Sequence, residues 1–208
     1  MKTVNTQKIK TVAGLSEIAA RAKQRGKKIV HCHGVFDLLH PGHLKHFQSA
    51  KDLGDILIVT VTPDKYVNRG PGRPIFKQAL GAESISHIGC VDFVAVNEWP
   101  TAVEAIKRIR PDLYVKGSEY AKKDEDVTGK IYDEEKAVTS VGGALVFTDD
   151  EIFSSTSIIN DFLTPYPQEA QSFLKKMKHV CSAGDVTERV KNLKDVRVLV
   201  VGDIIIDE

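Results

Sequence analysis

Apolar residues recur along this chain in two alternating patterns. Apolar runs of strand length cover residues 27–37, 55–62, 91–97, 111–117 and 142–148. Before and between these runs, apolar residues repeat every three to four positions, which predicts amphipathic helices at 15–26, 40–54, 78–89, 100–110 and 134–141, with a further helix opening at 154. The run DILIVTVT is continuous, as expected for a strand that is covered on both faces.

Strands that alternate with helices predict an α/β fold with a Rossmann-like parallel sheet, and such a sheet binds ligands at the carboxyl ends of its strands. After Pro165 and Pro167 the pattern changes to two helices and a strongly apolar strand, at 168–179, 185–195 and 196–207. We therefore expect a first domain, linker helices and the start of a truncated second domain, at 1–163, 164–195 and 196–208. The alternative is that the last strand joins the first sheet.

Bulk composition argues against several classes of protein. The 208 residues carry 29 Lys and Arg against 28 Asp and Glu, so a formal charge of +1 gives no reason to expect nucleic acid or a membrane surface as a partner. No apolar run reaches the ~18 residues of a membrane span, and the N-terminus lacks the apolar core of a secretory signal. Cys32, Cys90 and Cys181 are scattered, which fits reduced thiols in the cytoplasm.

Two histidines flank a Pro-Gly pair in the string HPGH, where a predicted strand gives way to a predicted helix. Pro41 suits the first helical position, so His40 would lie at or near the N-cap and His43 in the first turn, on the same side of the helix. Free backbone N–H groups and the positive end of the helix dipole make this a seat for phosphate. Gly42 would let an anion approach the backbone, and Gly34 would clear the same space from the preceding strand.

This arrangement suits nucleotidyl transfer. When a phosphate oxygen attacks the α-phosphate of a nucleoside triphosphate in line, negative charge builds on that phosphate and on the departing pyrophosphate. No covalent enzyme intermediate is needed, because positioning and charge stabilisation can supply most of the catalysis. Imidazoles, with a pKa near ~6.5, can donate to that charge as the cation or as the neutral N–H tautomer. Taken alone, the two histidines fit a helix cap and a surface histidine equally well.

The string GVFDLLHPGHLKHFQSAKDLGDILIVTVTPD resembles the signature region of the cytidylyltransferase-like nucleotidyltransferases, whose mark is G-x-F-D-x-x-H-x-G-H. Two further family features, YVKGSEY and FSSTSII, follow at fitting distances, so the resemblance covers about residues 14–163. It is closest to the sugar-phosphate type, such as heptose-phosphate adenylyltransferase. The tail VRVLVVGDIIIDE resembles the opening strand of ribokinase-like sugar kinases, a domain often fused to this transferase. The remainder of a kinase is absent from this sequence, so we expect no kinase activity from it.

The resemblance implies a role for each signature residue. His40 and His43 are the catalytic pair that contacts the triphosphate, and Lys116 joins them from the end of a predicted strand; a solvated lysine is the alternative. The residues implied in nucleotide binding are Gly34, Val35, Phe36, Asp37, Gly42, Gly117, Ser155, Thr156 and Ser157. Of these, Asp37 would brace the HPGH turn rather than do chemistry. The three hydroxyls at 155–157 would hold β- and γ-phosphates, although a plain N-cap needs only one of them.

Basic residues in the loop NRGPGRP are implied in substrate binding. The family often places such residues here to receive the substrate phosphate, and the planar guanidinium groups of Arg69 and Arg73 suit that task; ordinary surface arginines are the alternative. Many relatives carry an arginine at the position of Gly81, so that contact is missing here or is supplied elsewhere. The segment 121–136 looks longer than in the simplest relatives and would shape a substrate pocket or a dimer contact.

These features predict an enzyme that joins a nucleoside triphosphate, ATP or CTP, to a phosphorylated sugar or polyol and releases pyrophosphate. Mg²⁺ is expected with the triphosphate rather than in a protein cage. The resemblance also implies a homodimer and a fused sugar kinase in the full-length protein. A glycerol-3-phosphate-type cytidylyltransferase and a non-catalytic nucleotide-binding module are the rival readings.

A zinc site is a further rival, because five histidines lie between residues 31 and 46. At ~100° per residue in a helix, however, His40, His43 and His46 do not converge on one point. No cysteine or carboxylate is spaced to complete a tetrahedron with them. We therefore predict no protein-held metal.

Overall fold

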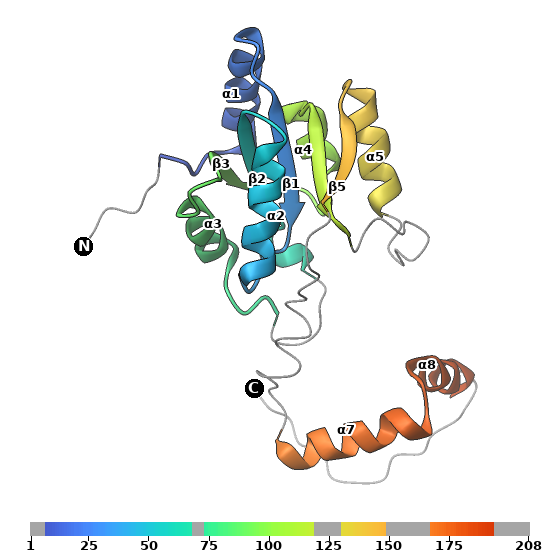
Figure 1. The fold of residues 1–208 in the computed structure, drawn as a ribbon. Helices are drawn as coiled ribbons and strands as arrows, with labels where there is room; N and C mark the ends of the chain where they lie inside the picture. Colours follow the sequence, from blue (N-terminus) through green and yellow to red (C-terminus); the bar gives the residue numbers. More distant parts are fainter. Residues whose placement is uncertain (1–6, 68–72, 119–129, 149–166, 194–208) are drawn as a thin grey trace, which may run out of the picture. The chain divides into compact units, whose positions relative to one another are not determined.

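The computed structural model describes residues 7–67, 73–118, 130–148 and 167–193 (Figure 1). The chain forms two compact units, Met1–Asn160 and Asp161–Glu208. The predicted domain boundaries at 163 and 195 lie outside the described residues and stay predictions. None of the helices in the described ranges combines the length and apolar character that a membrane crossing requires.

The first unit is built on one sheet of five strands in the order β3-β2-β1-β4-β5. The strands are β1 (Ile29–Gly34), β2 (Ile56–Val61), β3 (Phe93–Val96), β4 (Leu113–Gly117) and β5 (Ala144–Thr148). Every neighbouring pair is parallel, and β1 lies at the centre, between β2 and β4. The predicted α/β fold with a Rossmann-like parallel sheet is therefore confirmed.

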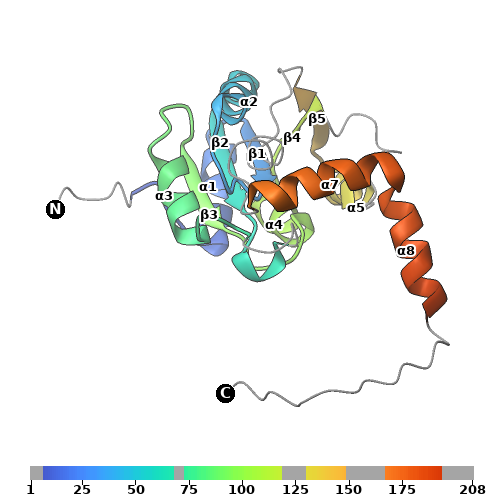
Figure 2. The ribbon, with the colours of Figure 1, turned by 90° about the horizontal axis from the view of Figure 1, so that it is seen from below.

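Helices cover both faces of this sheet (Figures 1 and 2). On one face, α2 (Pro41–Asp52) and α3 (Gln78–Ser86) bury an apolar layer that includes Phe47 and Ile85. On the other face lie α1 (Val12–Gln24), α4 (Val103–Ile109) and α5 (Lys130–Ser140), which bury Leu15, Ile106 and Val138. A short 3₁₀ helix, η1 (Asp64–Tyr66), follows β2. Cover on both faces explains why β2 and β3 consist almost wholly of apolar residues.

Two helices begin earlier than their apolar pattern indicates. The hydroxyl of Thr11 accepts a hydrogen bond from the Gly14 N–H at 3.1 Å, and this cap starts α1 at Val12 rather than at Leu15. Helix α5 begins at Lys130 rather than at Glu134. In both cases the added turn contributes a buried apolar residue that extends the stripe on the sheet-facing side.

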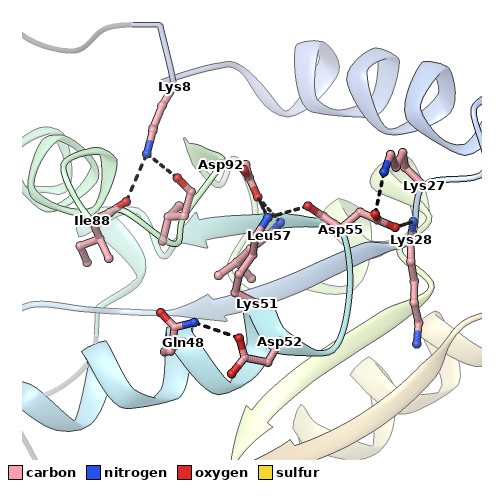
Figure 3. A network of polar contacts seen from close by, with 11 residues as sticks. Lys8, Lys27, Lys28, Gln48, Lys51, Asp52, Asp55, Leu57, Ile88 and Asp92 are labelled. Atoms are coloured by element: carbon pink, nitrogen blue, oxygen red, sulfur yellow. Dashed lines mark hydrogen bonds and ion pairs between the residues drawn. The ribbon is translucent and has the colours of Figure 1, made fainter.

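The amino edge of the sheet is closed by ion pairs and side-chain-to-backbone bonds, most of which Figure 3 shows. Asp55 accepts from the Lys28 N–H and from Lys27 Nζ, both at 2.8 Å, and these bonds lower its pKa. Asp92 accepts from the Leu57 N–H at 2.7 Å and from Lys51 Nζ at 2.6 Å. Each carboxylate thus fixes the first residues of a strand, and the amino edge is occupied by structural contacts.

The second unit contains α7 (Gln168–Val180) and α8 (Ala183–Asn192). A capping box starts α8: the Ser182 hydroxyl accepts from the Asp185 N–H at 3.2 Å, and the Asp185 carboxylate accepts from the Ser182 N–H at 2.7 Å. The predicted helical extension is confirmed. The apolar strand predicted at 196–207 lies outside the described residues.

Candidate active site

The site lies where the strand order reverses at the carboxyl edge of the sheet. After β1 the chain continues to β2 on one side, and after β4 it continues to β5 on the other side. In open α/β sheets the crevice between two such strands is the usual place for a ligand. Here the signature loop leaves β1 after Gly34, and Lys116 stands at the end of the adjacent strand β4.

The two signature histidines stand together at the start of α2. His40 is the N-cap and Pro41 is the first helical residue, as the sequence predicts. The imidazole rings of His40 and His43 are stacked, with their centroids 3.9 Å apart and their planes at 24°. His40 is buried and His43 is half-buried. The prediction that both rings face one region at a helix N-terminus therefore agrees with this geometry.

Phe36 holds this pair from the side of the sheet. Its ring meets the ring of His43 edge to face, at 5.2 Å and 79°, and lies 5.0 Å from the ring of Phe47 in the core. Its backbone is left-handed, with φ of +48°, a conformation that costs a non-glycine residue roughly 1–3 kcal/mol. The signature loop thus adopts a strained backbone conformation that places an aromatic ring against His43.

The role expected for Gly34 needs correction. A Cβ added at Gly34 would lie 2.8 Å from Cζ of Phe36. The space left by the missing side chain is therefore filled by the Phe36 ring and is not open to an anion. Glycine is required here because the aromatic ring folds back over the end of β1.

Asp37 and Arg73 form a buried ion pair. Arg73 Nη1 lies 2.8 Å from Asp37 Oδ2, and the two side chains are 7% and 3% exposed. The other oxygen of Asp37 accepts from the Phe76 N–H at 3.0 Å. Asp37 therefore connects the signature loop to the segment ahead of α3, and its expected role in bracing the HPGH turn stays a prediction. Arg73 is a buried residue rather than a surface arginine, and one of its donors is committed to Asp37.

Lys116 is held by a residue that the sequence analysis missed. Its Nζ lies 3.1 Å from Oε2 of Glu134 in α5, and the two side chains are 11% and 5% exposed. The ammonium also lies 5.5 Å from the centre of the Tyr114 ring. A usable signal was present: Glu134 interrupts the apolar stripe of α5, three residues after Ile131 and three before Ala137. An acidic residue in a buried stripe calls for a cationic counterpart.

Beneath the site, two histidines of β1 join two threonines of β2 in one chain of hydrogen bonds. The Thr60 hydroxyl lies 2.8 Å from Nε2 of His31 and 2.9 Å from Nδ1 of His33, and Nε2 of His33 lies 3.1 Å from the Thr62 hydroxyl. Burial, reinforced by the charge of Lys116, lowers the pKa of His31 to about 3 and that of His33 well below its ordinary value. Both rings are therefore neutral.

The remaining predicted residues divide into two groups. Gly42 is buried in the first turn of α2, Val35 follows β1, and Gly117 ends β4 in register with Thr148 of β5. A Cβ added at Gly81 would lie 3.8 Å from the Phe36 carbonyl oxygen, so this position borders the signature loop. The predicted contacts outside the described residues are those of Arg69, Ser155, Thr156 and Ser157. Within the described ranges, no group of three or more His, Cys, Asp or Glu side chains is placed to hold a metal ion.

A doubly wound parallel sheet that places a stacked H-x-G-H pair at the reversal of strand order defines a nucleotide-binding α/β domain. A sequence model of the family described as cytidylyltransferase-like matches residues 31–161. The chain belongs to this family, and the resemblance drawn from its signature is confirmed.

Two curated relatives of this chain carry the same name. The chain is 38% identical over 167 residues to the bifunctional protein HldE of Geobacter metallireducens, covering 78% of this chain and 32% of that protein. It is 42% identical over 139 residues to the bifunctional protein HldE of Campylobacter curvus, covering 65% and 29%. This chain therefore spans about a third of the length of these relatives.

Among solved structures, the lipopolysaccharide core biosynthesis protein of Thermoplasma volcanium is 25% identical to this chain. The match has a TM-score of 0.48 and covers 62% of this chain and 100% of that one.

Proposed function

We propose that this domain is a sugar-phosphate nucleotidyltransferase, which transfers a nucleotidyl group from a nucleoside triphosphate to a phosphorylated sugar and releases pyrophosphate. The observation that carries the proposal is the stacking of His40 and His43 at the N-terminus of α2. Rings held nearly parallel can direct donors at neighbouring oxygens of one phosphate group. Membership of the cytidylyltransferase-like family supports the same reaction class.

In this mechanism the protein binds and stabilises charge rather than forming a covalent bond. The oxygen of the sugar phosphate attacks the α-phosphorus, and the bond to the β-phosphate oxygen breaks as pyrophosphate leaves. The imidazole donors of His40 and His43 balance the charge that develops on the phosphates, and preorganised donors of this kind are worth about 10²–10³ each in rate. Phe36 keeps His43 in place, and Glu134 holds the Lys116 ammonium at the end of β4.

Magnesium would enter with the triphosphate as part of the substrate. Among the described residues of the site, two buried carboxylates are each paired with a cation, Asp37 with Arg73 and Glu134 with Lys116. Because both carboxylates are committed to ion pairs, we propose that the ion arrives bound to the substrate phosphates rather than held by a protein cage. Magnesium commonly binds through substrate phosphates and few protein ligands.

As substrates we propose ATP or CTP together with a sugar 1-phosphate, ATP and a heptose phosphate being the first pair to test. The resemblance to heptose-phosphate adenylyltransferase and the identity to HldE proteins support this choice. The name of those relatives, bifunctional protein HldE, supports a second domain in the full-length protein, for which we propose a fused sugar kinase. A homodimer and a cytoplasmic location stay predictions.

A pyrophosphate-release screen of four triphosphates against sugar 1-phosphates and polyol phosphates tests the reaction. We expect His40→Ala to lower kcat by about 10²–10³ while the Kd for nucleotide changes little, because the donor acts mainly in the transition state. His87→Ala, which removes an exposed imidazole at the end of α3, is the matched control. Turnover near the wild-type rate in His40→Ala would remove His40 from the chemistry. Nucleotide binding without pyrophosphate release from any pair would favour a non-catalytic module.

A further inference from the structure

We propose that Thr62 is a substrate-binding residue, whose hydroxyl hydrogen is directed out of the carboxyl edge of the sheet by the chain His31–Thr60–His33 and donated to an oxygen of the bound substrate. The acceptor is an oxygen of the nucleotide or of the phosphorylated sugar. This inference rests on the proposed function for the identity of the ligand, but its geometry comes from four side chains that neither the signature nor the proposed mechanism uses.

The chain runs along one face of the sheet toward the site. His31 and His33 are alternate residues of β1, and Thr60 and Thr62 are their neighbours on and just after β2. Three contacts of 2.8 to 3.1 Å connect the four groups in the order His31, Thr60, His33, Thr62. At the far end, Nδ1 of His31 is buried without a hydrogen-bond partner. This series of hydrogen bonds therefore ends in the core at His31 Nδ1 and, at its other end, at the Thr62 hydroxyl on the carboxyl edge of the sheet.

Counting the hydrogens of the four side chains favours one direction of the chain. Each neutral imidazole carries one N–H and each hydroxyl carries one O–H. If both rings carry the hydrogen on Nε2, His31 donates to Thr60, Thr60 donates to His33, and His33 donates to Thr62. All three contacts are then satisfied, the buried Nδ1 of His31 is a bare lone pair, and the Thr62 hydrogen has no acceptor within the chain.

The other arrangements are worse. Reversing the chain makes Thr62 donate inward and leaves an N–H on the buried Nδ1 of His31 without an acceptor. Letting both rings donate to Thr60 leaves the hydroxyl hydrogen of Thr60 unpaired in the core, where this residue is 0% exposed. Any remaining combination sets two lone pairs against each other. Orphaned buried N–H donors are rarer in proteins than under-satisfied acceptors, so the outward direction is favoured.

The position of Thr62 matches this role. Its backbone N–H donates to the carbonyl oxygen of Gly34 at 2.9 Å, which places it beside the first residue of the signature. It is 8% exposed, whereas Thr60 is fully buried, so the chain reaches solvent at the carboxyl edge. A ligand that occupies the crevice beyond β1 would supply the missing acceptor.

Thr62→Val removes the hydroxyl with little change in volume, and Thr62→Ser keeps it. With the full chain, calorimetry gives the Kd for MgATP and MgCTP, and the pyrophosphate assay gives the KM for a heptose 1-phosphate, glucose 1-phosphate, mannose 1-phosphate and glycerol 3-phosphate. We expect Thr62→Val to raise either the Kd for nucleotide or the KM for phosphorylated sugar about tenfold, and Thr62→Ser to restore the wild-type value. Thr139→Val, the same change at an exposed site of α5, should leave both arms unchanged.

A double-mutant cycle tests whether His33 acts through Thr62. His33→Phe keeps a ring but removes both nitrogens, and we expect it to weaken the same arm by about threefold in the wild-type background and not at all beside Thr62→Val. A structural effect of His33 would instead add to that of Thr62. Independently, ¹⁵N–¹H correlation spectra of the imidazoles should show His31 and His33 as Nε2–H tautomers.

The outcomes separate this inference from the proposed function. The inference alone is overturned if the wild-type protein turns over and Thr62→Val keeps both its nucleotide Kd and its sugar-phosphate KM within twofold of wild type. An Nδ1–H tautomer of His33 also overturns the inference alone. Nucleotide binding that is weakened in Thr62→Val, in a protein that never releases pyrophosphate, overturns the proposed function alone. A wild-type protein that binds no compound of either arm overturns both.

Discussion

Lowering the pH from 7 to 5 should destabilise the first unit through His31. This imidazole has an ordinary pKa of 6.5 in the unfolded chain, and burial lowers its pKa to about 3 in the folded protein. Between those two values the unfolded state binds a proton that the folded state does not. Stability is therefore lost as the pH falls below 6.5, and the loss levels off near pH 3.

The size of the effect follows from the unfolded state, because folded His31 stays neutral over this interval. Protonation of a group with a pKa of 6.5 lowers the free energy of the unfolded state by about 2 kcal/mol between pH 7 and pH 5. His33, whose pKa is lowered in the same direction by burial, adds a second contribution of the same sign. The wild-type protein should therefore lose stability steeply in this range.

Urea unfolding at pH 7 and pH 5 measures this loss, and fluorescence of Trp99, the single tryptophan, reports on the first unit. His31→Phe should reduce the difference between the two pH values by about 2 kcal/mol, whatever it does to stability at pH 7. His87→Phe removes an exposed imidazole that lies outside the His31–Thr62 chain and serves as the control. A His31→Phe variant that keeps the full wild-type difference would refute a buried, neutral His31.

Two further substitutions test the signature loop. Gly34→Ala should displace the Phe36 ring, since the new Cβ would lie 2.8 Å from it, and should lower kcat by about tenfold or more through His43, whereas Gly89→Ala, with open space around its Cβ, should match the wild type in both turnover and urea midpoint. Asp37→Asn leaves a buried guanidinium without its carboxylate and should cost about 3–5 kcal/mol in urea unfolding; a loss below 1 kcal/mol would show that the buried pair contributes little.

Local pattern predicted the elements of this fold but not the pairs between them. The apolar runs located all five strands, and the Pro-Gly pair located the start of α2 within a residue, because both signals are carried by neighbours in sequence. The ion pair of Lys116 with Glu134 joins β4 to α5, and no local signal links these two residues. The stripe of α5 marked Glu134 as unusual, but only the fold shows which cation it meets.

The histidines of β1 illustrate the same limit. In the sequence, His31 and His33 stand out only among the five histidines between residues 31 and 46, as candidate metal ligands. Their proposed role depends on Thr60, which the register of β1 and β2 sets opposite His33, and on Thr62, which follows two residues later. Sequence gives the alternation within each strand, whereas the hydrogen-bonded chain is a property of the pairing.

That pairing gives the central strand two unlike sides. Val30 and Cys32 face the apolar layer beneath α2, and His31 and His33 face the hydroxyls of β2. A register shift of one residue would move both imidazoles to the apolar face of the sheet and place aliphatic and thiol side chains beside Thr60. Each buried polar group left without a hydrogen-bond partner would cost roughly 1–3 kcal/mol. The hydrogen-bonded histidines and threonines therefore disfavour misregistered sheets during folding, which a uniformly apolar strand would tolerate.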